Sequence, residues 1–326
     1  MSATPTAEKT PDSAPGNAPQ STHNDPQRPG AWNALSHALA DIKLAHSVFA
    51  LPFAILAAVA SRPAEGSWPR FAGQLGVVVV CMVLARTWAM MINRLVDREF
   101  DAKNARTARR ALAAGRISAG QGWAIALACA AMFIGAAAMF WLCFDNRWPT
   151  LLSVPVLAWI AFYSFTKRFT WLCHVFLGGA LAASPLAAAI AVDPSSLSRL
   201  PVLWYLAGMV VLWVAGFDVI YAIQDLEFDQ REGLSSIPAR LGLRGAMWTS
   251  RVLHAGALAM LVLAWRSEAR LGAAFGAAVG LVAALLVTEH VVLARRGKAG
   301  LDMAFFTLNG IVSCVLGAAG CADLLV

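Results

Sequence analysis

The chain has 326 residues, of which 59% are hydrophobic and 14% are charged, and its mean hydropathy is +0.61. This composition excludes an ordinary soluble domain and predicts an all-α integral membrane protein with helices that span the bilayer. The formal net charge of +7 does not indicate a nucleic-acid partner, because the basic residues lie in short loops beside apolar runs, where topology and lipid headgroups account for them.

The first segment of the chain is polar, rich in Pro, Ser, Ala, Thr, Asn and Gln, and contains no apolar run. Such a composition is typical of disorder, so we expect a disordered cytoplasmic tail over residues 1–35 and one transmembrane domain over residues 36–326. The tail lacks the basic and apolar regions of a secretory signal. The first span is therefore expected to act as an uncleaved insertion signal.

Nine apolar runs follow, and each is long enough for a helix to cross the hydrocarbon core. The weakest boundary lies at 168–171, where few polar residues separate two runs. The predicted spans are 44–61, 74–97, 119–142, 149–167, 171–192, 201–225, 245–265, 271–294 and 303–325.

Basic residues are distributed unevenly between the two sides of these spans. With the amino terminus in the cytoplasm, 18 Lys and Arg residues lie inside and 6 lie outside. The positive-inside rule therefore predicts a cytoplasmic amino terminus and an external carboxyl terminus. We expect a multi-pass protein of a bacterial-type inner membrane.

Two acidic motifs of identical spacing end two of the spans, at 93–101 and 221–229. Their members recur at i, i+4 and i+8, so on an α-helix they drift by only about 40° per step and project from one side. Mg²⁺ prefers oxygen ligands and usually binds one or two carboxylates plus substrate phosphates. Two such half-sites on the cytoplasmic side indicate a site for a divalent metal and a diphosphate. The motif residues are Asn93, Asp97 and Asp101 in the first copy and Tyr221, Asp225 and Asp229 in the second.

The alternative is that these aspartates lie in solvated loops and form ordinary ion pairs with neighbouring arginines. Acids near the membrane are costly and usually functional, and the second copy at the same spacing favours a site. Asp218 precedes the second motif and either joins that site or caps its mouth.

Basic residues near the motifs also have two interpretations. The segment from Tyr163 to Arg168 places a polar pair, Tyr163 and Lys167, at the cytoplasmic end of a span, where a cation would bind a diphosphate leaving group. Lys167 and Arg168 would equally anchor a short inside loop by snorkelling. The same two interpretations apply to Arg109, Arg110 and Arg116.

Thiols and imidazoles do not predict a metal site. The six cysteines are scattered without a C-x-x-C spacing, so we interpret them as small core residues. His46 and His174 lie in apolar surroundings without a spaced His or Cys partner, and we interpret them as hydrogen-bonded core histidines.

Together the motifs resemble those of the UbiA superfamily of membrane prenyltransferases, from about Ile42 to the carboxyl terminus. The segments that carry the resemblance are 93–101, 108–118, 163–168 and 221–229. Two further segments, 46–53 and 233–242, resemble most the 4-hydroxybenzoate polyprenyltransferase branch, including its menaquinone-pathway members.

The resemblance implies nine helices around a central cavity, with the two motifs facing each other beneath a cytoplasmic cap. It implies a Mg²⁺-dependent transfer of a polyprenyl group from a polyprenyl diphosphate to a small aromatic acceptor, such as 4-hydroxybenzoate, in ubiquinone or menaquinone biosynthesis. The isoprenoid tail would need an apolar tunnel open to membrane lipid. The implied metal ligands are Asn93, Asp97, Asp101, Asp225 and Asp229.

The remaining site residues follow from the same resemblance. Lys167, assisted by Arg168 or Arg109, would stabilise the leaving pyrophosphate, and Lys43 or Arg98 would bind an acceptor carboxylate. Tyr163 and Tyr221 are expected among the substrate-binding residues.

Other functions stay open at this point. Within the enzyme class, the acceptor could instead be dihydroxynaphthoate, a futalosine-pathway intermediate, haem or a chlorophyll precursor. A cation-coupled secondary transporter would also use buried acids, although commonly near the bilayer midplane. A structural or assembly factor would not depend on the aspartates. No obligate protein partner is inferred.

Overall fold

The computed structural model describes residue 1, residues 49–297, residue 301 and residues 307–326. These residues form helices and turns and contain no strand. Seven of their helices are long and apolar enough to cross a membrane, which confirms an all-α membrane fold. They are α3 (Trp68–Val96), α5 (Ala119–Phe144), α6 (Trp148–Thr166), α7 (Cys173–Val192), α9 (Pro201–Ala222), α11 (Ile237–Ser267) and α12 (Ala273–Arg296).

Two shorter apolar helices, α2 (Leu51–Ala60) and α13 (Asn309–Leu325), lie close to stretches outside the described residues. With the seven longer helices they correspond one to one to the nine predicted spans. The predicted boundary at 168–171 is confirmed, because a turn separates α6 from α7. The expected tail over 1–35 lies outside the described residues apart from residue 1, and stays a prediction. Short helices connect the spans: α4 (Arg98–Lys103), α8 (Ser196–Arg199), the 3₁₀ turn η2 (Ile223–Asp225) and α10 (Leu226–Arg231).

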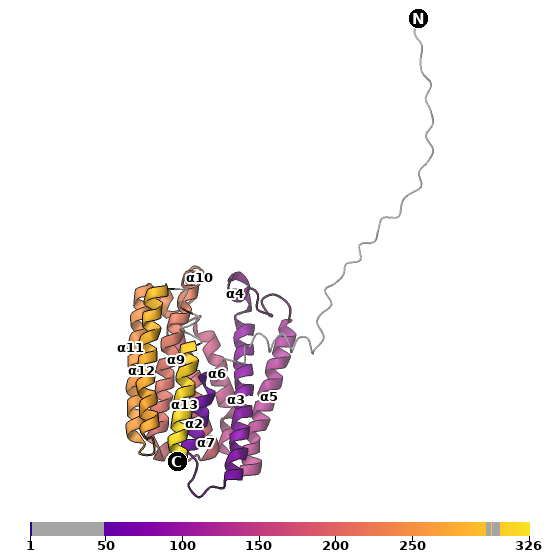
Figure 1. The fold of residues 1–326 in the computed structure, drawn as a ribbon. Helices are drawn as coiled ribbons and strands as arrows, with labels where there is room; N and C mark the ends of the chain where they lie inside the picture. The colour runs from indigo at the N-terminus through magenta and orange to yellow at the C-terminus, as the bar shows by residue number, and fades with distance from the viewer. Residues whose placement is uncertain (2–48, 298–300, 302–306) are drawn as a thin grey trace, which may run out of the picture.

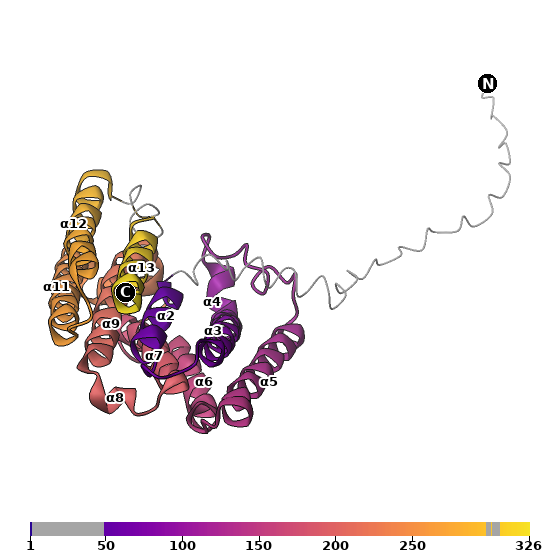
Figure 2. The same ribbon diagram turned by 60° about the horizontal axis from the view of Figure 1, so that its bottom comes forward.

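The nine helices named above, all within the described residues, form a ring in which each packs against the next along the chain. The packed pairs run from α2 with α3 through α12 with α13, and the contact of α13 with α2 closes the ring. Figure 2 shows this arrangement nearly end on. The helices run up and down, so their connections alternate between two ends (Figure 1).

Local sequence sets where several of these helices begin. Proline stands at one of the first two positions of α2, α3, α6, α9 and α11, where its fixed φ suits a helix and its missing N–H is not needed. Ser118 starts α5 with a capping box, because its side chain accepts from the Gln121 N–H and the Gln121 side chain accepts in return.

The centre of one side of the ring is α9, which packs against α7 and α11. Trp213 of this helix is fully buried, and its ring packs edge-on against Phe53 and Phe217. Small residues allow the backbones to approach closely. A Cβ on Gly178 of α7 would lie 2.3 Å from the Val211 carbonyl oxygen of α9, so no other residue fits there without a shift of the backbone.

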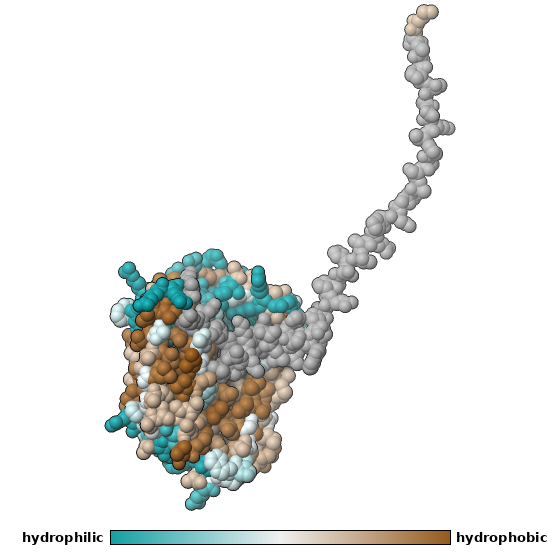
Figure 3. Space-filling model, viewed as in Figure 1, coloured by the Kyte–Doolittle hydropathy of each residue, from teal (hydrophilic) through white to brown (hydrophobic). Residues whose placement is uncertain are grey.

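The surface separates into an apolar belt and two polar ends. In Figure 3 hydrophobic side chains cover the flanks of the helices, and hydrophilic residues gather above and below them. The short helices α4 and α10 lie at one end and the carboxyl terminus at the other (Figure 1). Since α4 and α10 belong to the two acidic motifs, the fold brings both motifs to the same end of the bundle.

Candidate active site

Both acidic motifs lie where a long helix breaks into a short one. Asp97 caps the end of α3 with φ −91° and ψ 5°, and Asp225 ends the turn after α9 with φ −99° and ψ 5°. Asp101 and Asp229 then follow on α4 and α10. The predicted spans end at Asp97 and Asp225, and the structure places a break at these residues in both copies. The same break occurs in each, so the two motifs share a conformation as well as a spacing.

Side chains that follow the first motif reach the second motif and its neighbour Glu232 across the end of the bundle. Asn104 Nδ2 donates to Asp225 Oδ1 at 2.9 Å, and Arg106 Nε donates to the same oxygen at 3.0 Å. On the rim, Lys103 Nζ lies 2.9 Å from Glu232 Oε2. Residues more than 110 positions apart in the chain thus meet, and the two motifs face each other.

Each of the four motif aspartates has a basic partner, supplied by the loop after α4 or by the turn after α6. The loop gives Arg106 to Asp225 and Arg110 to Asp101, and the turn gives Arg168 to Asp97 and Lys167 to Asp229. The partners place four cations beside four carboxylates. The measured separations are Arg110 Nη1 to Asp101 Oδ1 2.7 Å, Lys167 Nζ to Asp229 Oδ1 2.7 Å and Arg168 Nη2 to Asp97 Oδ1 2.9 Å.

Because these side chains are partly or fully buried, their pKa values depend on their ion-pair partners. Asp229 is fully buried and Asp101 is 7% exposed. Burial raises the pKa of the Asp97 carboxyl above its usual range, although the Arg168 guanidinium opposes this effect. Burial lowers the pKa of the Lys167 ammonium, but the attraction of Asp229 outweighs it, so the net pKa is raised and Lys167 stays charged.

Neutral side chains orient two of the carboxylates. Asn93 Nδ2 donates to Asp97 Oδ2 at 3.0 Å, and Ser236 Oγ donates to Asp229 Oδ2 at 2.9 Å. Sequence reasoning missed Ser236, which lies after the second motif in a loop without periodicity. Its position before Pro238 at the start of a helix is the signal that could have identified it as a cap.

The donor set of the site consists of hard oxygens, which suits Mg²⁺. Within residues 49–297, 301 and 307–326, no group of three or more His, Cys, Asp or Glu side chains converges on a point that could hold one metal ion. Two half-sites would each contribute one or two carboxylates and leave the remaining positions to substrate oxygens and water. The ligand roles of Asn93 and the four aspartates stay predictions.

An apolar cavity of about 340 Å³ runs along the bundle between α3, α5, α6 and α7, and the start of α2 also lines it. It contacts α6 from Pro149 to Tyr163, which at 1.5 Å per residue is a length of about 21 Å. Most of the lining side chains are Ala, Leu, Val, Met and Phe. Tyr163 stands at the end of the cavity nearest the acidic motifs, one turn before Lys167.

Arg86 of α3 also lines this cavity, and sequence reasoning missed it. Its Nε is buried and has no hydrogen-bond partner among the described residues. It precedes Asn93 by seven residues, or about 10 Å, so the two side chains lie on nearly the same face of α3. A charged residue inside an apolar span was the available signal, since such residues are usually functional.

The other predicted site residues are placed differently. Tyr221 receives a hydrogen bond from Arg106, with Nη1 3.4 Å from the hydroxyl oxygen, so it lies in the site. Arg98 is exposed and lies 3.9 Å from Glu99, and Arg109 is exposed, with its backbone carbonyl bound by Arg116. Within the described residues, neither side chain forms an ion pair or hydrogen bond with a motif aspartate. Lys43 lies outside the described residues.

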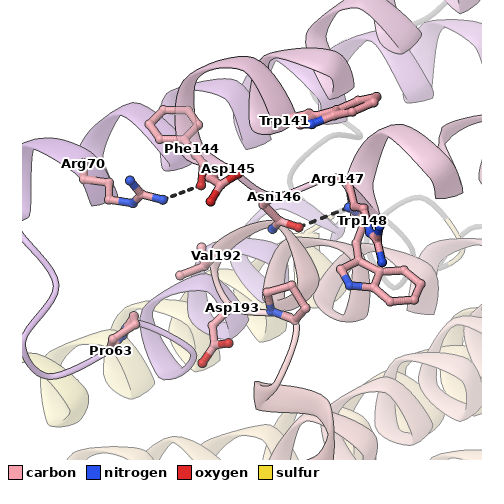
Figure 4. Close-up of a pocket in the computed structure, with 11 residues that line it drawn as sticks. Pro63, Arg70, Trp141, Phe144, Asp145, Asn146, Arg147, Trp148, Val192 and Asp193 are labelled. Atoms are coloured by element: carbon pink, nitrogen blue, oxygen red, sulfur yellow. Dashed lines mark hydrogen bonds between the residues drawn. The ribbon is translucent and has the colours of Figure 1, made fainter.

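A second hollow, of about 720 Å³, lies at the opposite end of the bundle (Figure 4). Its walls include Trp141, Trp148 and Asp193, and Arg70 donates to the Phe144 carbonyl at its edge. It lies at the ends of α5 and α7 that are remote from both motifs, so we do not assign the chemistry to it.

Comparisons with known proteins agree with this geometry. A profile described as the UbiA prenyltransferase family matches residues 50–311. The chain is 32% identical over 238 residues to the 4-hydroxybenzoate octaprenyltransferase of Methylococcus capsulatus, covering 72% of this chain and 76% of that protein. It is 34% identical over 236 residues to the 4-hydroxybenzoate octaprenyltransferase of Xanthomonas oryzae pv. oryzae, covering 72% and 74% respectively.

Solved structures show the same fold. The apo structure of a UbiA homolog from Aeropyrum pernix K1 superposes with a TM-score of 0.75 at 31% identity and covers 86% of this chain and 98% of that one. A UbiA homolog from Archaeoglobus fulgidus bound to GPP and Mg²⁺ superposes with a TM-score of 0.63 at 17% identity, covering 89% and 100%. The latter identity supports the fold alone. The family match over most of the sequence, together with the paired acidic motifs above an apolar cavity, shows that this chain belongs to the UbiA prenyltransferase family.

Proposed function

We propose that this protein transfers a polyprenyl group from a polyprenyl diphosphate to a small aromatic carboxylate, with 4-hydroxybenzoate in ubiquinone biosynthesis as the first candidate. The observation that carries the proposal is the pair of acidic motifs, joined by basic residues, at one end of an apolar cavity. Carboxylates and cations suit a metal-bound diphosphate, and the cavity suits its hydrocarbon tail. The 4-hydroxybenzoate octaprenyltransferases that resemble this chain support the choice of acceptor.

The basic residues would change partners when the donor binds. Asn93, Asp97, Asp101, Asp225 and Asp229 would hold Mg²⁺, which supplies charge neutralisation to the diphosphate. Lys167 and Arg168, now paired with Asp229 and Asp97, would then turn to the diphosphate oxygens. Because negative charge builds on the bridging oxygen as its bond to the allylic carbon breaks, a fixed cation there lowers the barrier more than it strengthens donor binding. The aromatic ring attacks the allylic carbon and afterwards loses a proton.

Arg86 supports an acceptor that carries an anionic group. Its guanidinium lines the cavity and its Nε has no hydrogen-bond partner among the described residues. A guanidinium with a free N–H in such a place favours an anion, and the carboxylate of an aromatic acid would provide one. This residue therefore replaces Arg98, which is exposed on α4, as the candidate for acceptor binding; Lys43 stays a prediction.

The test is an assay of the purified protein in lipid with a panel of aromatic acceptors and prenyl diphosphates of graded length. We expect pyrophosphate release that requires Mg²⁺, a carboxylate-bearing acceptor and an intact Asp97. The matched control is Asp193→Asn, an acid at the opposite end of the bundle, which should retain activity. Failure of every donor and acceptor pair in a well-folded preparation would contradict the proposed reaction.

We further propose that the site faces the cytoplasm of a bacterial-type inner membrane, as the distribution of basic residues predicts. Cysteines introduced at Lys103 and Gln230, in a background without the native six, should resist an impermeant thiol reagent in intact cells. They should react once the membrane is opened. Labelling of either loop from outside would place the acidic motifs on the wrong side for a donor supplied from the cytoplasm.

A further inference from the structure

A chain of hydrogen bonds centred on a buried histidine joins α9, α7 and the start of α11, beside the second acidic motif. His174 of α7 is 2% exposed, and its Nδ1 lies 2.6 Å from Asp218 Oδ2. On the other side of the ring, the backbone N–H of Ile237 donates to His174 Nε2 at 3.3 Å. Since an N–H can only donate, this contact assigns Nε2 as the acceptor and places the ring proton on Nδ1, which donates to Asp218.

The segment that His174 holds also carries Ser236. Ser236 is fully buried, caps α11 by accepting from the Ala239 N–H at 3.2 Å, and donates to Asp229 Oδ2. One residue earlier, the Ser235 N–H donates to the Lys167 carbonyl oxygen at 2.8 Å. The placement of this segment therefore determines where two predicted site residues, Asp229 and Lys167, lie.

A break in α11 lies directly behind this segment. Gly242 has φ 69° and ψ −178°, so the first turn of α11 is separated from the remainder of the helix by a break. This positive φ favours glycine, and it uncouples the direction of the first turn from the long helix behind it. The first turn is then held by hydrogen bonds to Lys167, Asp229 and His174, and by the packing of Ile237 in a cluster with Val219 and Ala246.

From this geometry we propose that His174 and Asp218 act as a positioning pair for the proposed reaction. Asp218 fixes the tautomer of His174, His174 holds the first turn of α11, and that turn aims Ser236 at Asp229. The pair does not contact substrate. The inference rests on the proposed function for its effect on catalysis, whereas the anchoring itself is a property of the protein without ligands.

The anchoring is tested by hydrogen exchange of the Ile237 amide in the metal-free, full-length protein. His174→Leu removes both hydrogen bonds and should raise exchange at Ile237 by about five-fold or more, since one buried hydrogen bond is lost. His174→Gln should restore slow exchange, because its amide can donate to Asp218 and accept from Ile237. Asp218→Ala should also raise exchange at Ile237, which it does not touch, because the ring loses the partner that keeps its proton on Nδ1.

The catalytic consequence is read from the Mg²⁺ concentration that gives half-maximal rate. It should rise by about ten-fold in His174→Leu and return close to the wild-type value in His174→Gln, as expected when the support of a predicted metal ligand is removed and restored. Adding His174→Leu to Ser236→Ala should change this Mg²⁺ concentration little further, because both substitutions act through Asp229. His290→Leu, which removes another hydrogen-bonded imidazole, on α12, should not change it.

Two results would overturn the proposal. One is unchanged Ile237 exchange in both His174→Leu and Asp218→Ala. The other is an equal loss of Ile237 protection in His174→Leu and His174→Gln. That result would show that the volume of the ring, and not its hydrogen bonds, holds the segment. Absence of prenyl transfer by the wild-type protein would instead contradict the proposed function, while the exchange comparison would still decide whether the anchor exists.

Discussion

Removing the Lys167 side chain should separate its structural and catalytic roles. Its ammonium lies 2.7 Å from an oxygen of the fully buried Asp229. At an effective dielectric constant of about 20, two unit charges at that distance attract by about 6 kcal/mol. Desolvation offsets part of this attraction, and Lys167 is 32% exposed and partly screened. We therefore expect Lys167→Ala to lower the free energy of unfolding by about 2–3 kcal/mol, less than for a fully buried pair.

The second substitution shows which part of the loss is catalytic. Asp229→Asn in the Lys167→Ala background removes the stranded carboxylate, so stability should largely return. Activity should not return, because no cation then stands near the departing pyrophosphate. Loss of one such group corresponds to a fall in kcat of about 10²–10³, with a smaller change in KM for the donor.

Thermal unfolding in lipid nanodiscs and single-turnover prenyl transfer measure the two effects on the same samples. Lys167→Arg is the matched control, since it keeps a cation and should retain most of the stability. The reasoning is refuted if Lys167→Ala changes only KM for the donor, or if the double variant recovers activity together with stability.

Three further predictions concern the metal, the acceptor and pH. Asp97→Asn and Asp225→Asn should each lower turnover by at least about 100-fold, which corresponds to about 3 kcal/mol in the activation free energy. The helical circular dichroism should stay unchanged. Full activity in excess chelator would contradict the metal site. Arg86→Leu should raise KM for a carboxylate acceptor by about ten- to a hundred-fold and leave KM for the donor unchanged, and steady-state kinetics decide this. Burial raises the pKa of Asp97, with Arg168 opposing, so the protonated form should persist above the usual Asp range and activity should fall on acidification sooner than for an ordinary carboxylate. Added Mg²⁺ should shift that fall to lower pH, and a pH profile insensitive to Mg²⁺ would argue against the assignment.

The arrangement of the helices was largely predictable from the sequence, because hydrophobic length alone marks a span. The end of α6 before Lys167 and the start of α7 at Cys173 agree with the weak polar break between them. The two acidic motifs were also visible, since a repeated spacing at two span ends is a local pattern. Their breaks at Asp97 and Asp225 were not, because a continuous i, i+4, i+8 pattern gives no sign of a change in helix direction.

Side-chain direction in the loop after α4 was beyond sequence reasoning. The loop has no periodicity, and its course depends on local bonds such as the Asn104 side chain accepting from the Arg106 N–H. These bonds turn Arg106 and Arg110 toward the aspartates and leave Arg109 exposed. His174 was correctly interpreted as a buried, hydrogen-bonded histidine, but its partners Asp218 and Ile237 come from other helices and could not be inferred.

The apolar cavity has a practical consequence for anyone who handles this protein outside a membrane. Its wall is built from aliphatic and aromatic side chains, and the attraction between such a wall and a hydrocarbon chain has no directional component. A detergent tail or a phospholipid acyl chain can therefore compete with an isoprenoid for the same space. Apparent affinities for long donors will depend on the solubilising agent and on the partitioning of the donor into its micelles, so donor lengths should be ranked in bilayers at a fixed mole fraction of donor to lipid.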